Sequence, residues 1–552
     1  MRKLPYIVVA VLVLIAFTFV RAVENSPEES ERAENIVEEN EDTESNPEDS
    51  IPEEEPAVEA LPTHLNIFYT DSLGVERVHS SALKDIGGIT FGRCDTTDYY
   101  SDILIDSTRV SMDSIKSYQL GTNVPLIRIY TDSAVNDVFS KEVYLSGYAT
   151  VDGYGHYDDL DSASLGVRGR GNTSWVEPKK PYRLKFTKKQ SLCGLAAAKS
   201  FVLIANYIDA THSRNAFAFK LSQLLEMPYA NHSIPVNVEF NGIPKGAYMM
   251  SEKVGIGKGS VNIDELTGIM WELDKSYDED YKFYSPIYNL PVMLADPDPE
   301  DILEELNNRW FPPVEPEEPG EEVTEPVEPE QPGEEVTEPI DPEEPGEEIT
   351  EPEEPNDTVP ERLTAEKWFD DWKEDFIRME QSVKNGTPEE TIDMNQVVDY
   401  ILVFLLTGNN EIDWPKSVKL YKQDKDSLYV FGPVWDFDWG YGYALPPTRK
   451  LFVTNDASLK GCKFFYDIVR RDSFKELFAK RWEYFKIELM PQWFDYMDEY
   501  SELIRISALQ DGELWPDPLY SSSDFDNQMK KVREWIEQRI ELIDKDKNNM
   551  LY

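Results

Sequence analysis

Apolar and polar residues alternate along residues 61–145, in short runs separated by turn residues. The clearest runs are "HLNIFYT", "VPLIRIYT" and "KEVYLSGYATV". A period of two is the spacing expected of a strand with one buried face. We therefore predict a small β-rich module at residues 61–145, in which no group of chemically active side chains stands out.

A second stretch, beginning at residue 146, mixes predicted strands with one helix. "LGVRGRGNTSW" and "KKPYRLKFTKK" predict two strands joined by a glycine-containing turn, and "GIMWELD" predicts a buried strand. "ANYIDATHSRNAFAFKLSQLL" predicts a loop that runs into an amphipathic helix. "PVNVEFNGIPKGAYMMSEKV" predicts a hairpin, because Asn-Gly lies between two alternating runs.

Helical spacing dominates the C-terminal part of the chain. "LTAEKWFDDWKEDFIRM" and "NQMKKVREWIEQRIELIDK" each place large apolar residues on one helical face. "DMNQVVDYILVFLLTGNNEIDW" predicts a helix that ends at Thr407-Gly408 and is followed by a polar loop. "SVKLYKQDKDSLYVFGPVWDFDW" predicts a hairpin. Together these patterns indicate an α+β fold that extends to about residue 545.

Two segments carry most of the net negative charge. The net charge is −52, and residues 23–60 and 312–356 together carry −34 of it. The second segment contains a 13-residue repeat, "EPEEPGEEVTEPV", whose regular prolines exclude helix and sheet. We predict a disordered acidic linker at 23–60 and a disordered acidic, proline-rich insertion at 312–358. Strong acidity argues against a nucleic-acid partner.

The first 22 residues have the pattern of an export signal. Arg2 and Lys3 precede an uncharged apolar run, and Val20-Arg21-Ala22 offers a small-residue cleavage site. We predict a signal peptide at 1–22 and an exported protein, whether secreted, periplasmic or on the cell surface. An uncleaved N-terminal membrane anchor is the alternative. Three cysteines are too few for a disulfide framework, and five scattered histidines argue against zinc.

Two aspartates within an aromatic stretch are the first candidate for chemistry. "GPVWDFDWGYG" contains Asp436 and Asp438, and Asp413 precedes it in a polar loop before the predicted hairpin. Phosphoryl-transfer kinases use this order: a catalytic-loop Asp, a hairpin, and an Asp that holds Mg²⁺. A magnesium ion would offset the cost of burying these carboxylates among aromatic residues. Alternatively, Asp413 caps a turn and Asp436 pairs with a lysine.

Basic residues surround the predicted glycine turn. The residues are Arg168, Arg170, Lys179, Lys180 and Lys185. A glycine turn lets backbone amides approach a phosphate, and cations neutralise it. The alternative is an ordinary solvated strand face.

Five stretches, in order, resemble the CotH family of spore-coat-protein-H-type kinases. They are "VRGRGNTSWVEPKKPYRLKF", "VLIANYIDATHSRNAFAFKL", "VEFNGIPKGAYMMSEKV", "MWELD" and "GPVWDFDWGYG". The resemblance implies an atypical, two-lobed protein-kinase-like domain at residues 146–545. It also implies phosphorylation of secreted or surface proteins with ATP and a divalent metal, Mg²⁺ or Mn²⁺.

Site residues follow from this resemblance position by position. Asp413 matches the catalytic aspartate and Asp436 the metal-binding one, with Asp438 as a second metal or supporting group. Lys185 is the first candidate for the phosphate-contacting lysine and Glu252 for its ion-pair partner. Further candidates for the nucleotide site are Lys180, Arg168, Arg170, Glu272 and Asp274, with Arg214 and Asn215 either structural or lining the site.

One position departs from the kinase pattern. Kinase catalytic loops carry an Asn five residues after the catalytic Asp, where it holds a second magnesium ion. Five residues after Asp413, this chain has Val418, preceded by Ser417. The sequence therefore leaves two functions open: an exported kinase acting on Ser or Thr, and a catalytically silent surface scaffold or adhesion protein.

Overall fold

The computed structural model describes residues 63–310, 362–443, 445–452 and 460–552, with short gaps between residues 72 and 134. The predicted signal peptide, the acidic linker at 23–60 and the whole insertion at 312–358 lie outside these residues. Within them, helices and strands are mixed, which confirms the α+β class.

The N-terminal strands form two separate three-stranded antiparallel sheets. One sheet has the order β2-β1-β6, and the other has the order β3-β4-β5. Every strand described before residue 122 belongs to one of these two sheets. Their bounds are β1 (His64–Thr70), β2 (Glu76–Ala82), β3 (Ile89–Arg93), β4 (Tyr100–Ile105), β5 (Thr108–Ser111) and β6 (Ile115–Gly121).

A closed barrel of seven strands follows, in the order β10-β11-β13-β12-β7-β8-β9. All its neighbouring strand pairs are antiparallel except β7 and β12, which are parallel. The bounds are β7 (Leu126–Thr131), β8 (Leu145–Asp152), β9 (Leu160–Gly169), β10 (Tyr182–Gln190), β11 (Ala198–Ile204), β12 (Ile234–Phe240) and β13 (Ile243–Glu252).

The barrel begins earlier than the domain boundary drawn from the sequence. β7 and the start of β8 lie before residue 146, within the segment predicted as a separate module. β7 joins the barrel through its parallel pairing with β12, more than a hundred residues later in the chain. Local alternation predicts that β7 is a strand, but it carries no information about so distant a partner.

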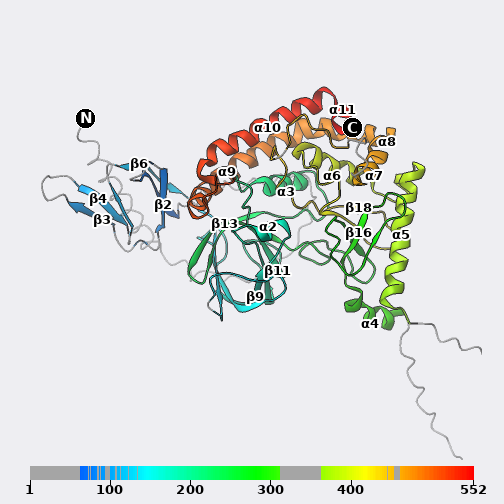
Figure 1. Ribbon diagram of the computed structural model, residues 1–552, viewed down its shortest axis with the longest axis horizontal. Helices are drawn as coiled ribbons and strands as arrows, with labels where there is room; N and C mark the ends of the chain where they lie inside the picture. The colour runs from blue at the N-terminus through cyan, green and yellow to red at the C-terminus, as the bar shows by residue number, and fades with distance from the viewer. Residues whose placement is uncertain are drawn as a thin grey trace, which may run out of the picture. The chain divides into compact units, whose positions relative to one another are not determined.

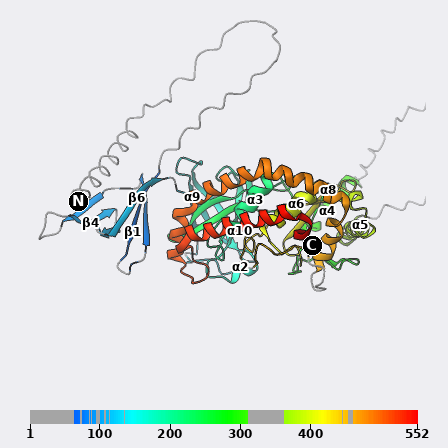
Figure 2. The same ribbon diagram turned by 90° about the horizontal axis from the view of Figure 1, so that it is seen from above.

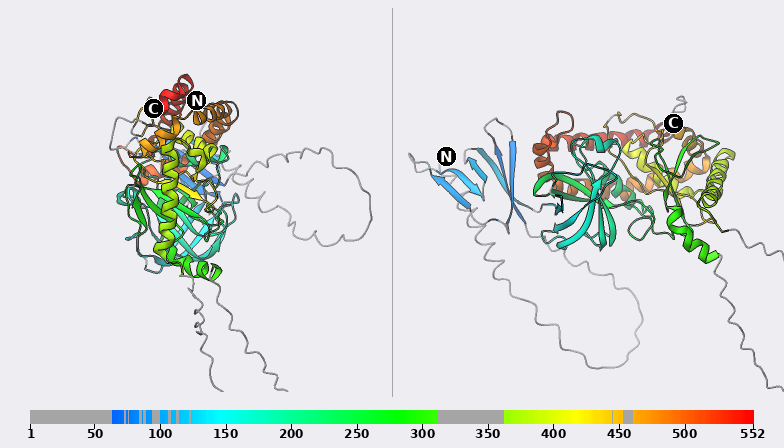
Figure 3. Two further views of the ribbon diagram at one scale, coloured as in Figure 1. Left: turned by 90° about the vertical axis from the view of Figure 1, so that its right-hand side faces the viewer. Right: turned by 60° about the horizontal axis from the view of Figure 1, so that its bottom comes forward.

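A second sheet of five strands has the order β15-β16-β14-β17-β18. It joins strands from both sides of the acidic insertion, because β14 pairs with β17 from Ile269–Lys422 to Leu273–Val418. Figure 3 shows the barrel and this sheet as separate groups of strands. The bounds are β14 (Ile269–Leu273), β15 (Lys282–Tyr284), β16 (Pro291–Asp296), β17 (Val418–Lys422) and β18 (Val430–Phe431).

Helices pack on the second sheet and against one side of the barrel. In Figure 1, α10 runs beside α9, and seen from above they lie over α3 and α6 (Figure 2). The longer helices are α3 (Arg214–Leu224), α4 (Pro299–Trp310), α5 (Ala365–Asn385), α6 (Met394–Thr407), α7 (Lys460–Val469), α8 (Asp472–Tyr484), α9 (Met490–Leu514) and α10 (Phe525–Lys545), and short ones are α2 (Thr173–Val176) and α11 (Lys547–Leu551).

The described chain contains two main hydrophobic cores. One fills the barrel with residues such as Leu184, Phe201 and Tyr248. The other lies between the five-stranded sheet and the helices, around Trp271 and Phe404. Each core is built from the apolar positions that the sequence pattern placed on one face of a strand or helix.

Several local predictions are confirmed. β12 and β13 form the hairpin at Asn241-Gly242, where both residues have a positive φ. α6 ends at Gly408, whose φ of 64° is the left-handed conformation that glycine adopts most readily. None of the helices in the described ranges combines the length and apolar character needed to cross a membrane. Cys193 is a free, buried thiol.

Candidate active site

A cavity of about 290 Å³ is walled by segments of both the barrel and the five-stranded sheet. The barrel supplies the turn after β9 and the loop after β11, and α3 contributes Asn215. The sheet side supplies the end of β14, the start of β17 and the segment that follows β18. The wall is rich in charge: seven acidic and three basic residues line it. A cavity with this lining suits a ligand that carries both phosphate and a cation.

Asp436 lies in the wall, where three neighbours hold it. Its backbone φ of 68° is left-handed, which is uncommon for a residue other than glycine. Ser417 Oγ donates to Asp436 Oδ2 at 3.3 Å, and Lys416 Nζ lies 3.6 Å from the same oxygen. Asn409 Nδ2 donates to the Asp436 carbonyl at 3.0 Å. A strained backbone held from several sides is typical of functional sites.

Asp438 lies beside Asp436 in the cavity wall. Asn215 Nδ2 donates to Asp438 Oδ1, and Asn215 Oδ1 accepts from the Phe437 amide at 2.7 Å. Arg214 Nη1 donates to the Asp438 carbonyl at 3.0 Å. Burial, and then the negative charge of Asp436, raise the pKa of Asp438 to about 7. The two residues of α3 that the sequence left open therefore position this second aspartate.

The two aspartates fit a metal that is bound with phosphate, as opposed to a cage of protein ligands. Within the described chain, no group of three or more His, Cys, Asp or Glu side chains is arranged to hold a metal ion. Magnesium commonly takes one or two carboxylates and completes its shell with phosphates and water. Asp436 and Asp438, adjacent in the wall and mutually repelling, match that requirement.

Arg170 is the candidate phosphate-contacting residue of the β9–β10 region that lines the cavity. Its guanidinium lies 5.6 Å from the centre of the Trp435 ring. Burial lowers the pKa of Arg170, and Asp436 and Asp438 oppose that change. Gly171 follows with a φ of 79°, and a Cβ there would collide with Ser174 Oγ. The glycine turn predicted from the sequence is therefore required by the local backbone.

The other basic candidates of this region do not line the cavity. Lys180 Nζ donates to the carbonyls of Trp175 and Glu177 at 2.9 and 2.6 Å. Lys185 is exposed, and both Lys185 and Arg168 lie near the ring of Tyr144. Arg168 and Lys185 lie on adjacent strands, where side-chain direction alternates along the chain. The sequence pattern alone does not say which face of the barrel meets the cavity.

Glu252 and Glu272 have partners that the sequence did not indicate. Glu252 Oε1 lies 2.6 Å from His232 Nδ1, so its ion-pair partner is His232 and not Lys185. Glu272 lines the cavity and pairs with Lys419 at 2.7 Å. These two residues face each other in the register of β14 and β17. Sequence reasoning missed Lys419, because the pairing joins strands on opposite sides of the insertion.

Asp274 also lines the cavity, at the end of β14. Its Oδ1 accepts from the Ser276 amide at 2.7 Å, and its Oδ2 accepts from the Ser417 amide at 3.1 Å. Asp274 therefore ties the loop before β17 to the end of β14. This contact fixes the position of Ser417 beneath Asp436.

Asp413 lies outside the cavity wall. Its side chain is 0% exposed, and within the described residues neither carboxyl oxygen has a hydrogen-bond partner. Arg449 Nη2 is 3.7 Å from Asp413 Oδ2. Burial raises the pKa of Asp413 well above its usual value. A buried carboxyl group without hydrogen bonds is unusual, and such groups are often tied to catalysis.

Glu411 is a second buried carboxyl group of the same loop. Its Oε1 lies 3.3 Å from Lys416 Nζ, and its amide donates to Asn409 Oδ1 at 2.9 Å. Burial and the charge of Asp436 raise the pKa of Glu411 to about 8, although Lys416 opposes the shift. The sequence analysis did not single out Glu411 or Lys416. The one sign of them in the sequence is that both are charged residues close to the "IDW" motif.

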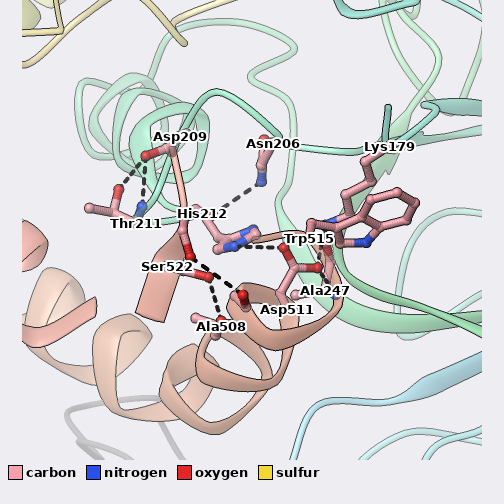
Figure 4. Close-up of polar contacts among 12 residues, drawn as sticks. Lys179, Asn206, Asp209, Thr211, His212, Ala247, Ala508, Asp511, Trp515 and Ser522 are labelled. Atoms are coloured by element: carbon pink, nitrogen blue, oxygen red, sulfur yellow. Dashed lines mark hydrogen bonds and ion pairs between the residues drawn. The ribbon is translucent and has the colours of Figure 1, made fainter. Parts of the chain in front are cut away.

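A buried polar network fixes the loop between β11 and α3 (Figure 4). Asp209 accepts hydrogen bonds from the amides of Thr211, Ser213 and Arg214 at 2.9–3.0 Å, so it caps the start of α3. This cap positions the first turn of the helix, which carries Asn215. The Asp438 contact described above therefore depends on a residue six positions before Asn215.

Lys179 belongs to this network and not to the cavity. Its Nζ donates at 2.5 Å to Asp511 Oδ1 on α9 and to the Ala247 carbonyl on β13. The other oxygen, Asp511 Oδ2, lies 3.4 Å from His212 Nε2 (Figure 4). Burial lowers the pKa of His212 far below its usual value, so the ring is neutral. The network joins the barrel, the β11–α3 loop and α9.

Comparison with protein families identifies the class of the chain. The model of the CotH kinase protein family matches residues 167–304 and 341–543, which is more than half of the chain. The chain therefore belongs to the CotH family, as the sequence motifs indicated. The comparison with curated proteins gives no match. The two matched segments contain each cavity-lining residue named above. The gap between them covers most of the insertion.

Proposed function

We propose that this protein is an exported CotH-type protein kinase that transfers the γ-phosphoryl group of ATP to Ser or Thr of secreted or surface proteins. Membership of the CotH family supports an atypical protein kinase. The observation that carries the proposal is the meeting of Asp436, Asp438 and Arg170 at one cavity. This arrangement provides carboxylates for a cation and a guanidinium for phosphate.

The residues of the cavity divide the work of binding. Arg170 contacts phosphate oxygens, and Asn215 keeps the Asp438 carboxylate in place through its hydrogen bond. A divalent cation held by Asp436 and Asp438 would neutralise the phosphates and orient them. Trp435 and Trp439 wall the cavity and reduce its contact with water. We infer that the barrel and the helical body with its sheet are the two lobes of the kinase-like domain.

Asp413 is our candidate for orienting the acceptor hydroxyl and accepting its proton. Its side chain does not line the cavity. Catalytic hydrogen bonds often form only in the complex with substrate, so this geometry does not exclude the role. Glu411, in the same loop, is the alternative base.

A catalytically silent scaffold is the second candidate function. Two observations favour it: Val418 takes the place of the kinase Asn, and the carboxyl group of Asp413 is buried away from the cavity. In that case the fold would serve binding or display at the cell surface. Ser417 weakens this alternative, because its hydroxyl donates to Asp436 and supplies a polar contact next to the missing Asn.

Radiolabelled ATP distinguishes the two functions. The full chain is incubated with labelled ATP and Mg²⁺ or Mn²⁺, with and without a panel of secreted proteins. We expect label on protein Ser or Thr, and loss of at least about 10²-fold in Asp436→Ala, because the cation loses a carboxylate. A wild-type chain that incorporates no label, yet gains heat stability with magnesium-ATP, would support the scaffold.

A further inference from the structure

Lys416 places an ammonium group among the carboxylates of the cavity. Its Nζ lies 3.6 Å from Asp436 Oδ2 and 3.3 Å from Glu411 Oε1. The side chain is only 12% exposed. In the described chain, it is the basic residue that forms an ion pair with Asp436, the aspartate that matches the metal-binding position of the family.

The backbone around Lys416 is held by hydrogen bonds, and its side chain is held by ion pairs. The Lys416 amide donates to the Glu411 carbonyl at 3.2 Å, and the next amide, of Ser417, donates to Asp274 Oδ2 at 3.1 Å. The ammonium itself is held by ion pairs at 3.3 and 3.6 Å. A four-carbon stem with free rotation lets such a group move several ångströms.

The other two basic residues of the wall have further partners. Lys419 pairs with Glu272 at 2.7 Å, and Arg170, which is influenced by the charges of Asp436 and Asp438, lies over the Trp435 ring. The Lys416 ammonium therefore lies where its charge would repel a cation that approaches Asp436. It also lies where a phosphate brought to Asp436 by that cation would meet a positive charge.

We propose that Lys416 is the resident counter-ion of Asp436 in the nucleotide-free chain and exchanges this carboxylate for the phosphates of the bound metal–nucleotide. The inference rests on the proposed function, since it assigns a residue to the same site. Glu411 keeps the ammonium near the cavity during the exchange. In this exchange Lys416 repels a metal ion that arrives alone. It attracts the phosphates of a metal ion that arrives with nucleotide.

The exchange predicts that loss of Lys416 changes two binding affinities in opposite directions. We measure binding of Mn²⁺ alone and of Mn²⁺ with a non-hydrolysable ATP analogue to the full chain by calorimetry. In Lys416→Met, Mn²⁺ alone should bind about fivefold more tightly, because a nearby like charge is gone. The Mn²⁺–analogue complex should bind about tenfold more weakly, because a charge-assisted phosphate contact is lost.

Two further variants keep the test decisive. Lys416→Met with Glu411→Gln removes both charges of the buried Lys416–Glu411 pair, so it serves if the single variant folds poorly, and it should show the same opposite shifts. Lys188→Met removes an exposed lysine of β10 and should change neither affinity. Parallel weakening of both affinities, or no change in either, overturns the proposal.

The kinase function can fail separately. A wild-type chain that binds neither Mn²⁺ nor the Mn²⁺–analogue complex overturns both proposals. A chain that binds the complex but transfers no phosphate overturns the kinase function only. The role of Lys416 then stands if the two affinities still shift in opposite directions.

Discussion

Asp413 carries a fully buried carboxyl group that accepts no hydrogen bond, and its pKa is raised by that burial. An acid with a higher pKa in the folded chain binds more protons when folded. The free energy of unfolding therefore falls as the pH rises from about 4, its value in the unfolded chain, toward the folded pKa. An asparagine at this position is neutral at every pH and lacks this loss.

We therefore expect Asp413→Asn to gain stability relative to the wild type between pH 4 and pH 7.5. The relative gain should exceed about 1 kcal/mol, because each unit of pKa shift is worth about 1.4 kcal/mol. Urea unfolding at both pH values measures it, with the exposed Asp426→Asn as the control. If the difference between Asp413→Asn and wild type does not change with pH, the group is ionised in the folded chain.

The same variant separates stability from catalysis. If Asp413 is ionised in the substrate complex and accepts the hydroxyl proton there, phosphate incorporation by Asp413→Asn should fall by about 10²-fold or more while the chain stays folded. Incorporation within about threefold of the wild type, on that same scale, would transfer the role to Glu411. A stable but inactive Asp413→Asn protein is the result we expect.

Residue types were easier to predict than residue positions. Two aspartates among aromatic residues indicated Asp436 and Asp438, and the cavity contains both. Among the basic candidates, Arg170 lines the cavity but Lys180 and Lys185 do not. The choice depends on how the barrel closes and which strand face meets the sheet. Neither is written in the local alternation of residues 160–190.

At the scale of elements, the contact between the barrel and α9 contains a buried ion pair. Lys179 is completely buried, and its ammonium binds Asp511 Oδ1 and the Ala247 carbonyl at 2.5 Å. The Ala247 amide donates to the same carboxylate at 2.8 Å. A Cβ at the preceding residue, Gly246, would collide with Asp511 Oδ1. The glycine thus allows α9 to approach β13, which Figure 3 shows beside it.

Removing Asp511 should strongly destabilise this junction. Asp511→Ala leaves the Lys179 ammonium buried without its partner, which costs about 3–5 kcal/mol. Adding Lys179→Met to Asp511→Ala should restore a large part of that loss, because no buried charge then remains. Denaturant unfolding of the wild type and the three variants measures both steps. The third variant is Lys179→Met alone. If the double variant loses the sum of what the two single variants lose, the pair is not coupled.

Strands, helices and short hairpins were predictable at this scale because their signals are local. The Asn241-Gly242 hairpin and the glycine end of α6 are examples. The Lys179–Asp511 pair was not predictable, because its members are separated by more than three hundred residues. The sequence analysis had given Lys179 a phosphate-neutralising role, which its complete burial in this pair excludes.

At the scale of the whole molecule, the base of the insertion is closed by residues that lie outside it. α4 ends at Trp310 and α5 begins at Ala365. Asn307 Nδ2 donates to the Leu363 carbonyl at 3.0 Å, and the Leu363 amide donates to Asn307 Oδ1 at 2.8 Å. These two hydrogen bonds join the chain before the insertion to the chain after it. α4 and α5 also pack directly against each other.

Deleting residues 315–355 should therefore leave the fold and phosphate incorporation intact. The deletion removes 41 of the 54 residues between Trp310 and Ala365, leaving a connector of 13. This fourfold shortening lowers the entropy cost of closing the loop by about 1.2 kcal/mol. For a domain of this size we expect a melting temperature that is unchanged or raised by up to about 5 °C. Thermal melts and labelled incorporation measure both effects.

The Asn307→Ala substitution tests whether the Asn307–Leu363 hydrogen bonds, and not the insertion, hold the two ends of the insertion together. It removes both hydrogen bonds and leaves the Leu363 groups without partners, at a cost of about 1–3 kcal/mol. Because Asn307 and Leu363 remain in both chains, the substitution should cost the full-length and the shortened protein the same amount. A deletion that lowers the melting temperature by more than about 5 °C would mean that residues 315–355 contribute contacts to the core. Loss of incorporation at an unchanged melting temperature would instead give the insertion a part in recognising the protein substrate.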